Sequence, residues 1–251
     1  MAVYKGLEAT LHEAFWGDRG SDLEVKEIMR LFPDFSGKAL EVGAGSGRIL
    51  RPLAEAYWDI EGIEPATEMV EMFEETCDPV LKGAIKPVKL EEYESTEKYD
   101  VVLMTSYVFQ LFEEPGEVFA KAKELLAPGG RLYFSVFIPW AEIVGELIEG
   151  EWLVDDEIKL PENKRARCWV NFELNRVRQR LIRKHRYEIS QRKQVLEMTK
   201  TEQHIRWYTL PEMELQFEKY GLEMQSLSCE FTEEFDQDAH SMSFVVTVKE
   251  D

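Results

Sequence analysis

The sequence predicts an α/β fold in which a seven-stranded, mostly parallel sheet is flanked by helices and carries an inserted antiparallel β lid. Within residues 38–138, short apolar segments alternate with segments whose apolar residues have helical spacing. Parallel neighbours need a crossover that covers a face of the sheet, so this alternation indicates a parallel sheet. Residues 165–205 instead form longer, partly alternating segments with no helix between them, which predicts the antiparallel insertion.

The expected elements follow one another in chain order. A helix at residues 22–32 begins behind Asp22 as its cap. Strands are expected at residues 38–45, 59–65, 84–93, 99–106 and 130–138, with helices at 46–57, 66–76 and 115–130. The insertion is expected to hold strands at residues 165–174, 177–189 and 193–205. A helix at 210–221 and a hairpin of strands at 222–231 and 241–250 complete the main sheet.

This pattern divides the chain into two parts. Residues 1–138 and 206–251 are expected to form a ligand-binding α/β domain. Residues 139–205 are expected to form an inserted subdomain that acts as a lid, supplies substrate contacts or mediates dimerisation.

The amino-acid composition indicates the cellular compartment of the protein and which kinds of site it contains. Of its 251 residues, 44% are hydrophobic and 31% charged, as in an ordinary globular protein. The N-terminal residues lack the pattern of a signal peptide, and no segment reaches the roughly 18 apolar residues of a membrane span. Cys77, Cys168 and Cys229 lie far apart, which fits reduced thiols in a cytoplasmic protein. No spaced set of Cys, His and carboxylates suggests a metal site.

Charge is distributed unevenly along the chain. The net charge is −19, yet residues 159–200 hold 13 Lys or Arg against 4 Asp or Glu, and the remainder holds 17 against 45. The arginines at 176, 178 and 180 alternate, so a strand would present them on one face. Three interpretations stay open: a solvated strand face, a pairing with an acidic surface of this chain or a second subunit, or a site for an anionic substrate such as a phosphate, a carboxylate or nucleic acid.

A glycine-rich turn at the first strand–helix junction is the strongest functional signal. The segment Glu41-Val42-Gly43-Ala44-Gly45-Ser46-Gly47-Arg48 has the spacing Gly-x-Gly-x-Gly. Glycines there let the backbone turn sharply and let a ligand approach it closely. The dinucleotide fingerprint has one more residue before its third glycine, and no Gly-Lys-Ser/Thr follows, so nicotinamide and nucleoside triphosphate sites are disfavoured.

A carboxylate at the end of the second strand provides a second anchor point. Glu64 follows Gly43 by 21 residues. At the carboxyl end of a parallel strand, its oxygens can accept hydrogen bonds from both hydroxyls of a ribose. The alternatives to ligand binding are that the glycines only form a tight turn and that Glu64 is only an exposed carboxylate in a loop.

At this point the chain resembles the class I S-adenosylmethionine (SAM)-dependent methyltransferases, which have a Rossmann-like fold. The matching blocks are ALEVGAGSGRIL, GIEPATEMV, the segment before YDVVLMTS, VFQLF and ELLAPGGRLYF, and they cover about residues 38–138. Two positions depart from the family pattern: Lys89 stands where many relatives have Asp, and Leu111 where close relatives often have His.

The resemblance implies which residues bind the cofactor. The methionine part of SAM would be held by Glu41 and the turn after it, Gly43, Ala44, Gly45, Gly47 and Arg48. Glu64 would bind the ribose. The adenine would be bordered by Pro65, Met69, Leu90 and Glu91. The sulfonium would lie above Thr105 and Ser106, and the substrate side would begin at Phe109 and Gln110. Two roles stay open for Tyr4 and Trp16: folding over the cofactor from the N-terminal segment, or packing in the core or in a hydrophobic staple.

The insertion is similar to that of small-molecule N- and O-methyltransferases, where such a segment supplies substrate contacts. His185, His204 and Tyr208 are therefore the candidate catalytic groups, with Tyr107 and Tyr187 as further lining candidates. His12 and His240 are expected to be peripheral. A histidine near the acceptor can remove its proton, although a lone histidine on a strand is more often structural.

The sequence thus predicts a SAM-dependent methyltransferase that acts on nitrogen or oxygen of a small molecule and releases S-adenosylhomocysteine. An RNA or protein methyltransferase that uses the basic insertion is one alternative. A non-catalytic SAM-binding scaffold is another. Because charge is distributed asymmetrically along the chain, we expect that the protein can form a homodimer.

Overall fold

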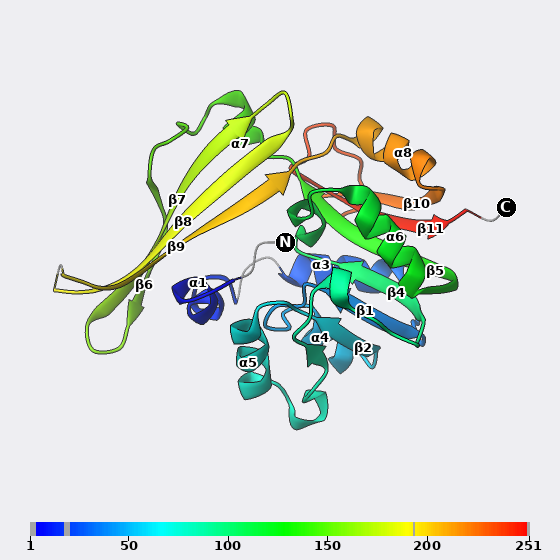
Figure 1. Ribbon diagram of the computed structural model, residues 1–251, viewed down its shortest axis with the longest axis horizontal. Coiled ribbons are helices and arrows are strands. Elements are labelled where there is room, and N and C mark those ends of the chain that lie inside the picture. Colours follow the sequence, from blue (N-terminus) through cyan, green and yellow to red (C-terminus); the bar gives the residue numbers. More distant parts are fainter. Residues whose placement is uncertain (1–3, 18–20, 193, 250–251) are drawn as a thin grey trace.

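The structure is a computed structural model of the 251-residue chain, and it describes residues 4–17, 21–192 and 194–249. Two sheets dominate it (Figure 1). The strands of the main sheet are β1 (Lys38–Val42), β2 (Asp59–Ile63), β3 (Ile85–Lys86), β4 (Tyr99–Met104), β5 (Leu126–Phe137), β10 (Leu222–Cys229) and β11 (Ser241–Val248). They lie in the order β10-β11-β5-β4-β1-β2-β3, and β11 alone is antiparallel to both of its neighbours. The predicted α/β fold is confirmed.

Helices cover both faces of the main sheet. Their bounds are α3 (Ser21–Leu31), α4 (Leu50–Glu55), α5 (Thr67–Thr76), α6 (Pro115–Leu125) and α8 (Leu210–Lys219). A further short helix, α7 (Trp140–Val144), lies beside the second sheet. Short 3-10 helices are η1 (Pro79–Leu81), η2 (Leu90–Glu92) and η3 (Val108–Leu111). Along β4, Val102 and Met104 belong to the cluster beneath α6 and α8, whereas Val101 and Leu103 belong to the cluster beneath α3, α4 and α5. Both faces are apolar because a parallel sheet is covered on both sides.

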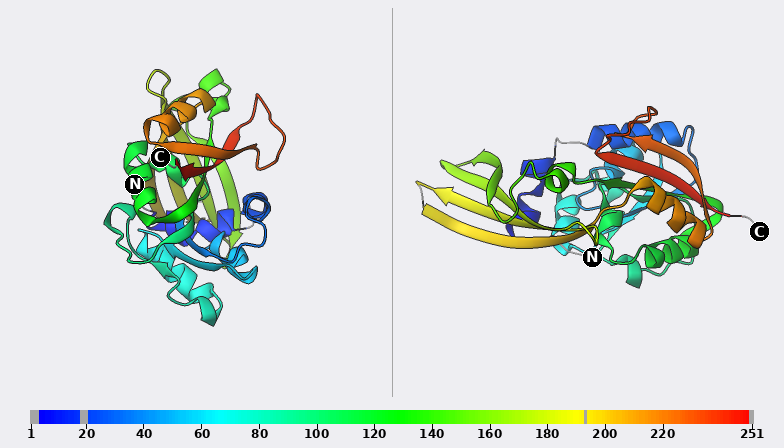
Figure 2. Two further views of the ribbon diagram at one scale, coloured as in Figure 1. Left: turned by 90° about the vertical axis from the view of Figure 1, so that its right-hand side faces the viewer. Right: turned by 90° about the horizontal axis from the view of Figure 1, so that it is seen from above.

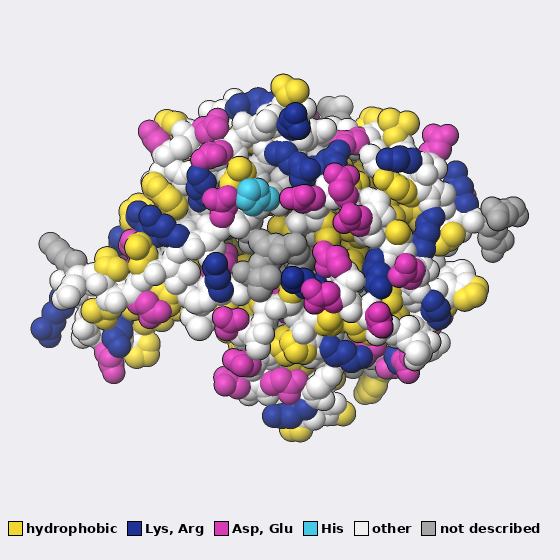
Figure 3. Space-filling model, viewed as in Figure 1, with side chains coloured by type: hydrophobic (Ala, Val, Ile, Leu, Met, Phe, Trp, Pro, Cys, Tyr) yellow, Lys and Arg dark blue, Asp and Glu magenta, His cyan; other side chains and the backbone are white. Residues whose placement is uncertain are grey.

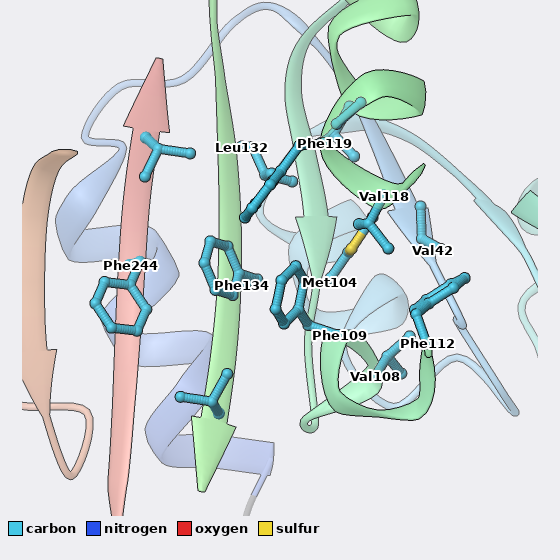
Figure 4. Close-up of a cluster of buried hydrophobic side chains, with 14 of the residues drawn as sticks. Val42, Met104, Val108, Phe109, Phe112, Val118, Phe119, Leu132, Phe134 and Phe244 are labelled. Carbon is cyan, nitrogen blue, oxygen red and sulfur yellow. The ribbon is translucent and has the colours of Figure 1, made fainter. Parts of the chain in front are cut away.

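A row of aromatic rings fills the core between the main sheet, α6 and α8. The rings of Phe109 and Phe134 are stacked with centroids 4.4 Å apart, and those of Phe134 and Phe244 lie 5.2 Å apart. Figure 4 shows these three side chains side by side, from η3, β5 and β11. All three are fully buried, so truncating one to alanine removes on the order of 3–5 kcal/mol of stability.

The second sheet is antiparallel and has the order β6-β7-β8-β9. Its strands are β6 (Leu153–Leu160), β7 (Lys164–Asn175), β8 (Arg180–Gln191) and β9 (Gln194–Arg206). Figures 1 and 2 show it extending away from the main sheet. Two short N-terminal helices, α1 (Leu7–Thr10) and α2 (His12–Trp16), pack on its inner face. Leu7, Leu11 and Phe15 contact Cys168 and Tyr187 there.

Three expectations about individual elements are wrong. The predicted strand at 84–93 shrinks to β3, because Pro87 has no N–H for a ladder, and η2 follows. Strand β6 was not expected. Arg176, Arg178 and Arg180 do not share a strand face, because residues 176–179 form the turn between β7 and β8. Arg176 instead donates to the backbone carbonyls of residues 142 and 143, and Arg180 to that of residue 113.

Within the described ranges 4–17, 21–192 and 194–249, no helix is long and apolar enough to cross a membrane. Cys77, Cys168 and Cys229 are free thiols.

Candidate functional site

A cavity of about 560 Å³ lies where the carboxyl ends of β1, β2 and β4 face the inner side of the second sheet. Its floor is the turn after β1, its far wall is formed by β7, β8 and β9, and α1 and α2 close one side. The volume is in the range of cavities that hold cofactors and small ligands. Ligands of parallel α/β sheets bind at this edge.

The glycine turn shapes the floor of the cavity through backbone conformations that other residues avoid. Gly43 and Gly47 have φ of +74° and +83°. A Cβ at Gly43 would lie 2.7 Å from Val108, and one at Gly47 would lie 2.5 Å from Phe73. Gly43, Ala44 and Gly45 line the cavity, whereas Gly47 lies behind the turn and lets it pack on α5. The turn therefore depends on glycine both for conformation and for close packing.

Glu64 is fixed at the end of β2 by two backbone donors. The N–H of Gly45 donates to its Oε2 at 3.0 Å, and the N–H of Ala66 donates to its Oε1 at 2.8 Å. The residue is only 5% exposed, and burial raises the pKa of its carboxyl. Each oxygen keeps a further lone pair for a ligand in the cavity. The pair of backbone contacts orients both lone pairs before a ligand arrives.

Glu41 presents an acceptor that the protein leaves unsatisfied. The Thr105 hydroxyl donates to its Oε1 at 2.7 Å, but its Oε2 is buried and has no hydrogen-bond partner among the described residues. Burial raises the pKa of the Glu41 carboxyl to about 8. Buried polar atoms are rarely left unpaired, because the lost hydration costs about 1–3 kcal/mol. An ammonium group of a ligand would satisfy this oxygen and stabilise the carboxylate.

A strained turn follows β4 and carries the next predicted residues. Ser106 and Tyr107 have φ of +51° and +63°, which side chains other than glycine rarely adopt. The carboxylate of Glu24 accepts from the backbone N–H of Ser106 at 2.9 Å, and Ser135 Oγ accepts from that of Tyr107 at 3.2 Å. These contacts hold the turn against its backbone strain. Thr105, Ser106 and Tyr107 all line the cavity.

The N-terminal segment closes the cavity with residues that are four positions apart. Tyr4, Glu8, His12 and Trp16 all line the cavity. The Ser46 hydroxyl donates to the carboxylate of Glu13 on α2 and so ties this segment to the glycine turn. The expectation that His12 is peripheral is wrong, and neither His12 nor Glu8 was selected from the sequence. The four-residue spacing from Tyr4 is the helical signal that could have found them.

The far side of the cavity combines aromatic, cationic and anionic groups. Its lining includes Tyr107, Phe137, Glu142, Phe172, Arg183, His185, Tyr187 and Ile205. The Arg183 guanidinium lies 5.2 Å from the centre of the Phe137 ring and 3.3 Å from Oε1 of Glu142. Burial lowers the pKa of His185 to about 4. The imidazole is therefore neutral near pH 7, and its contact with a carboxylate is not an ion pair.

The structure brings twelve of the predicted site residues to the cavity: Tyr4, Trp16, Glu41, Gly43, Ala44, Gly45, Arg48, Glu64, Met69, Thr105, Ser106 and His185. Gly47, Pro65, Leu90, Glu91, Phe109, Gln110, His204 and Tyr208 lie outside its lining. Leu90 and Phe109 are in the core, and Glu91 is exposed. Pro65 is partly buried beside the glutamate that precedes it.

The contacts and exposure of three residues outside the cavity show where each lies in the fold. The Gln110 amide donates to the carbonyls of Phe137 and Arg206 and accepts from the N–H of Phe137, so it fastens the end of β5 to that of β9. Tyr208 is fully buried with its ring 5.6 Å from that of Phe109. The side chain of His204 is 61% exposed and pairs with Glu202.

The residues present fit SAM. Glu64 offers two oriented acceptors for a ribose, and the unpaired oxygen of Glu41 suits the ammonium of the methionine part. The turn beneath them leaves its backbone open to the ligand. Among the residues that the structure describes, no group of three or more His, Cys, Asp or Glu could hold a metal.

Comparison with known proteins agrees with this geometry. The profile of a family described as a methyltransferase domain matches residues 15–227. The malonyl-[acyl-carrier protein] O-methyltransferase of Halalkalibacterium halodurans is 28% identical over 107 residues, which are 40% of this chain and 39% of that protein. The match therefore spans well under half of this relative.

Two solved structures share the fold over nearly the whole chain. A SAM-dependent methyltransferase from Clostridium acetobutylicum has a TM-score of 0.76 at 9% identity, and the match covers 96% of this chain and 97% of that one. The sugar N-methyltransferase KedS8 from a Streptoalloteichus species has a TM-score of 0.73 at 16% identity, with 100% and 97% covered. The chain therefore belongs to this family of methyltransferase domains, and it shares its fold with SAM-dependent methyltransferases.

Proposed function

We propose that the protein transfers the methyl group of SAM to a nitrogen or oxygen atom of a small molecule, with S-adenosylhomocysteine as the second product. The observation that carries this proposal is the single cavity lined both by the glycine turn and by the inner face of the second sheet. In this proposal residues 139–205 form the lid and acceptor wall of the site.

The division of labour within the cavity supports this assignment. Bound SAM supplies an activated methyl group on its sulfonium. Glu41, Glu64 and the glycine turn orient it from the main sheet, and the residues of β7, β8 and β9 are left to hold the acceptor. Alignment of the two reactants in one site supplies several kcal/mol of barrier reduction, on the order of 7–11 kcal/mol in well-oriented intramolecular reactions.

The size and closure of the cavity favour a small acceptor. Its volume of about 560 Å³ is shared by SAM and acceptor, and α1 and α2 close one side. The two named relatives are an O-methyltransferase and a sugar N-methyltransferase, so both oxygen and nitrogen acceptors occur among similar proteins.

The basic segment gives little support to an RNA or protein substrate, because several of its cations are paired with carboxylates. Arg165 and Arg167 contact Glu157, and Lys184 contacts Glu173. Figure 3 shows positive and negative side chains intermixed on the visible face. A phosphate backbone is attracted by unbalanced positive charge, which this pairing reduces.

Transfer of radioactive methyl groups tests the proposal. The purified protein is incubated with methyl-labelled SAM and separate pools of amines, hydroxylated metabolites, total RNA and protein. We expect label in a small-molecule pool, with none in RNA or protein. Label that enters only RNA or protein would contradict the proposed acceptor class, and binding of SAM with no transfer to any pool would indicate a non-catalytic scaffold.

A further inference from the structure

Two unpaired polar atoms face each other inside the cavity, where α1 and β8 meet in its lining. Glu8 on α1 is 3% exposed, and its Oε1 lies 3.8 Å from Nδ1 of His185 on β8. Both atoms are buried, and neither has a hydrogen-bond partner among the described residues. Their separation is too long for a direct hydrogen bond. A donor group of a bound molecule would therefore relieve an energetic cost at this point.

We propose that Glu8 is the general base of the methyl transfer and takes the proton of the attacking amine or hydroxyl. This inference rests on the proposed function. The lone pair of the acceptor atom forms the new bond to the methyl carbon, and the sulfur–methyl bond breaks with its electron pair remaining on sulfur. The proton of the acceptor moves to Oε1 of Glu8, and the carboxylate becomes a carboxylic acid.

Electrostatics distinguish Glu8 from His185 as a base. Burial raises the pKa of Glu8 to about 7. Hydrogen bonding by the Thr201 side chain and the charge of Lys5 lower this pKa and so oppose part of the rise. A base is most effective when its pKa lies near the working pH. Burial and Arg183 lower the pKa of His185 to about 4, so the imidazole binds a proton too weakly at neutral pH. His185 is left as a neutral group that positions the acceptor beside the carboxylate.

The other groups around Glu8 do not compete for the proton. The titratable and charged groups that act on its charge or line a pocket with it include Tyr4, Lys5, Cys168, Lys184, His185, Tyr187, Lys200 and Glu202. Burial raises the pKa of Tyr4 and of Cys168 to about 12, and raises that of Tyr187 further. Both phenols and the thiol therefore stay protonated at neutral pH. The pKa of Glu8, about 7, lies closer to neutrality than those of these three groups and of His185.

Direct titration tests the assignment without an acceptor. The carboxyl carbons of ¹³C-glutamate-labelled protein are followed by NMR in the complex with S-adenosylhomocysteine, and Glu8→Gln identifies the resonance of Glu8. We expect a midpoint near 7 for Glu8. A midpoint close to the ordinary glutamate value of about 4.3 would overturn the proposal, because the carboxylate would then be a weak base.

Kinetics with the acceptor found in the labelled pools provide the second readout. We expect Glu8→Gln to lower kcat by about 10²- to 10⁴-fold and to remove the acidic limb of the pH–rate profile. The affinity for S-adenosylhomocysteine should stay unchanged. The matched control is Glu218→Gln, the same change on the exposed surface of α8, which should leave kcat unaffected.

The outcomes separate this inference from the proposed function. An active wild-type protein whose kcat and pH profile survive Glu8→Gln would overturn the base assignment alone. A wild-type protein that binds S-adenosylhomocysteine and methylates no small molecule would overturn both. Loss of S-adenosylhomocysteine binding in Glu8→Gln would place Glu8 in the cofactor site, which would also contradict its assignment as the base.

Discussion

Replacing Glu64 with alanine is the sharpest test of how this protein holds SAM. The carboxylate is buried at the end of β2 and is held by the N–H groups of Gly45 and Ala66 at 3.0 and 2.8 Å. Its two remaining lone pairs point to the cavity, where the ribose hydroxyls would donate to them. The change removes both acceptors at once and leaves the rest of the lining in place.

The expected loss follows from the strength of hydrogen bonds to a charged group. Such bonds contribute about 1.5–3 kcal/mol each, and water that enters the emptied space compensates part of the loss. We therefore expect a net loss of about 1.5–3 kcal/mol, which is about a 10- to 150-fold increase in the dissociation constant of S-adenosylhomocysteine.

Isothermal titration calorimetry measures the effect of Glu64→Ala directly. Glu68→Ala is the matched control, because Glu68 is exposed on α5 and lies four residues after Glu64 in the sequence. Thermal unfolding of both variants checks that the fold is retained. Unchanged affinity in a folded Glu64→Ala protein would refute the reasoning and remove Glu64 from the cofactor site.

Three further predictions address the turn, the core and the ionisation of the cavity. Gly43→Ala should cost about 1–3 kcal/mol in urea unfolding, since φ is +74° and the new Cβ would meet Val108; undiminished stability would contradict the geometry. Gln110→Ala should cost about 2–4 kcal/mol, because two hydrogen bonds at the end of β5 and one at the end of β9 are lost, while S-adenosylhomocysteine affinity is unchanged; a weakened affinity would return Gln110 to the cofactor site. The ligand-free protein should lose stability on the order of 2 kcal/mol between about pH 6.5 and about pH 7.5. Three buried carboxyls have pKa values raised to about 7, 7 and 8, those of Glu8, Glu24 and Glu41. Below those pKa values the folded state therefore binds more protons than the unfolded state, and this proton binding stabilises the fold. The stabilisation is lost as the pH rises through the three pKa values. The lowered pKa of His185 affects stability only at more acidic pH. Calorimetric melting in this window checks the sign, and a melting temperature that rises with pH would contradict it.

Local sequence patterns predict the fold and the part of the cavity that the glycine turn and Glu64 line. The glycine spacing after β1 and the position of Glu64 are set within a short stretch of chain, because a sharp turn and a strand end determine where those groups point. The alternation of apolar strands and helices predicts a parallel sheet in the same way, because each strand and helix can be recognised within a short segment of the sequence.

The far wall of the cavity was less predictable because distant segments build it. Glu8 reaches the cavity only because Leu7 and Leu11 pack on Cys168 and Tyr187, more than 150 residues away along the chain. No local sequence pattern predicts this packing of the N-terminal helices on the second sheet. Phe109 and Gln110 were expected to face the substrate, but η3 is one short turn and directs them into the core and to the end of β5. A segment of four residues has too little periodicity to show which side is buried.

The most direct test of the central claim is calorimetric titration of the purified protein with S-adenosylhomocysteine, with NADH as the control. The account predicts binding of S-adenosylhomocysteine in the micromolar range and none of NADH, because Glu41, Glu64 and the glycine turn fit the methionine and ribose of that ligand. Binding of NADH without S-adenosylhomocysteine, or binding of neither, would contradict the assignment of this cavity as a SAM site.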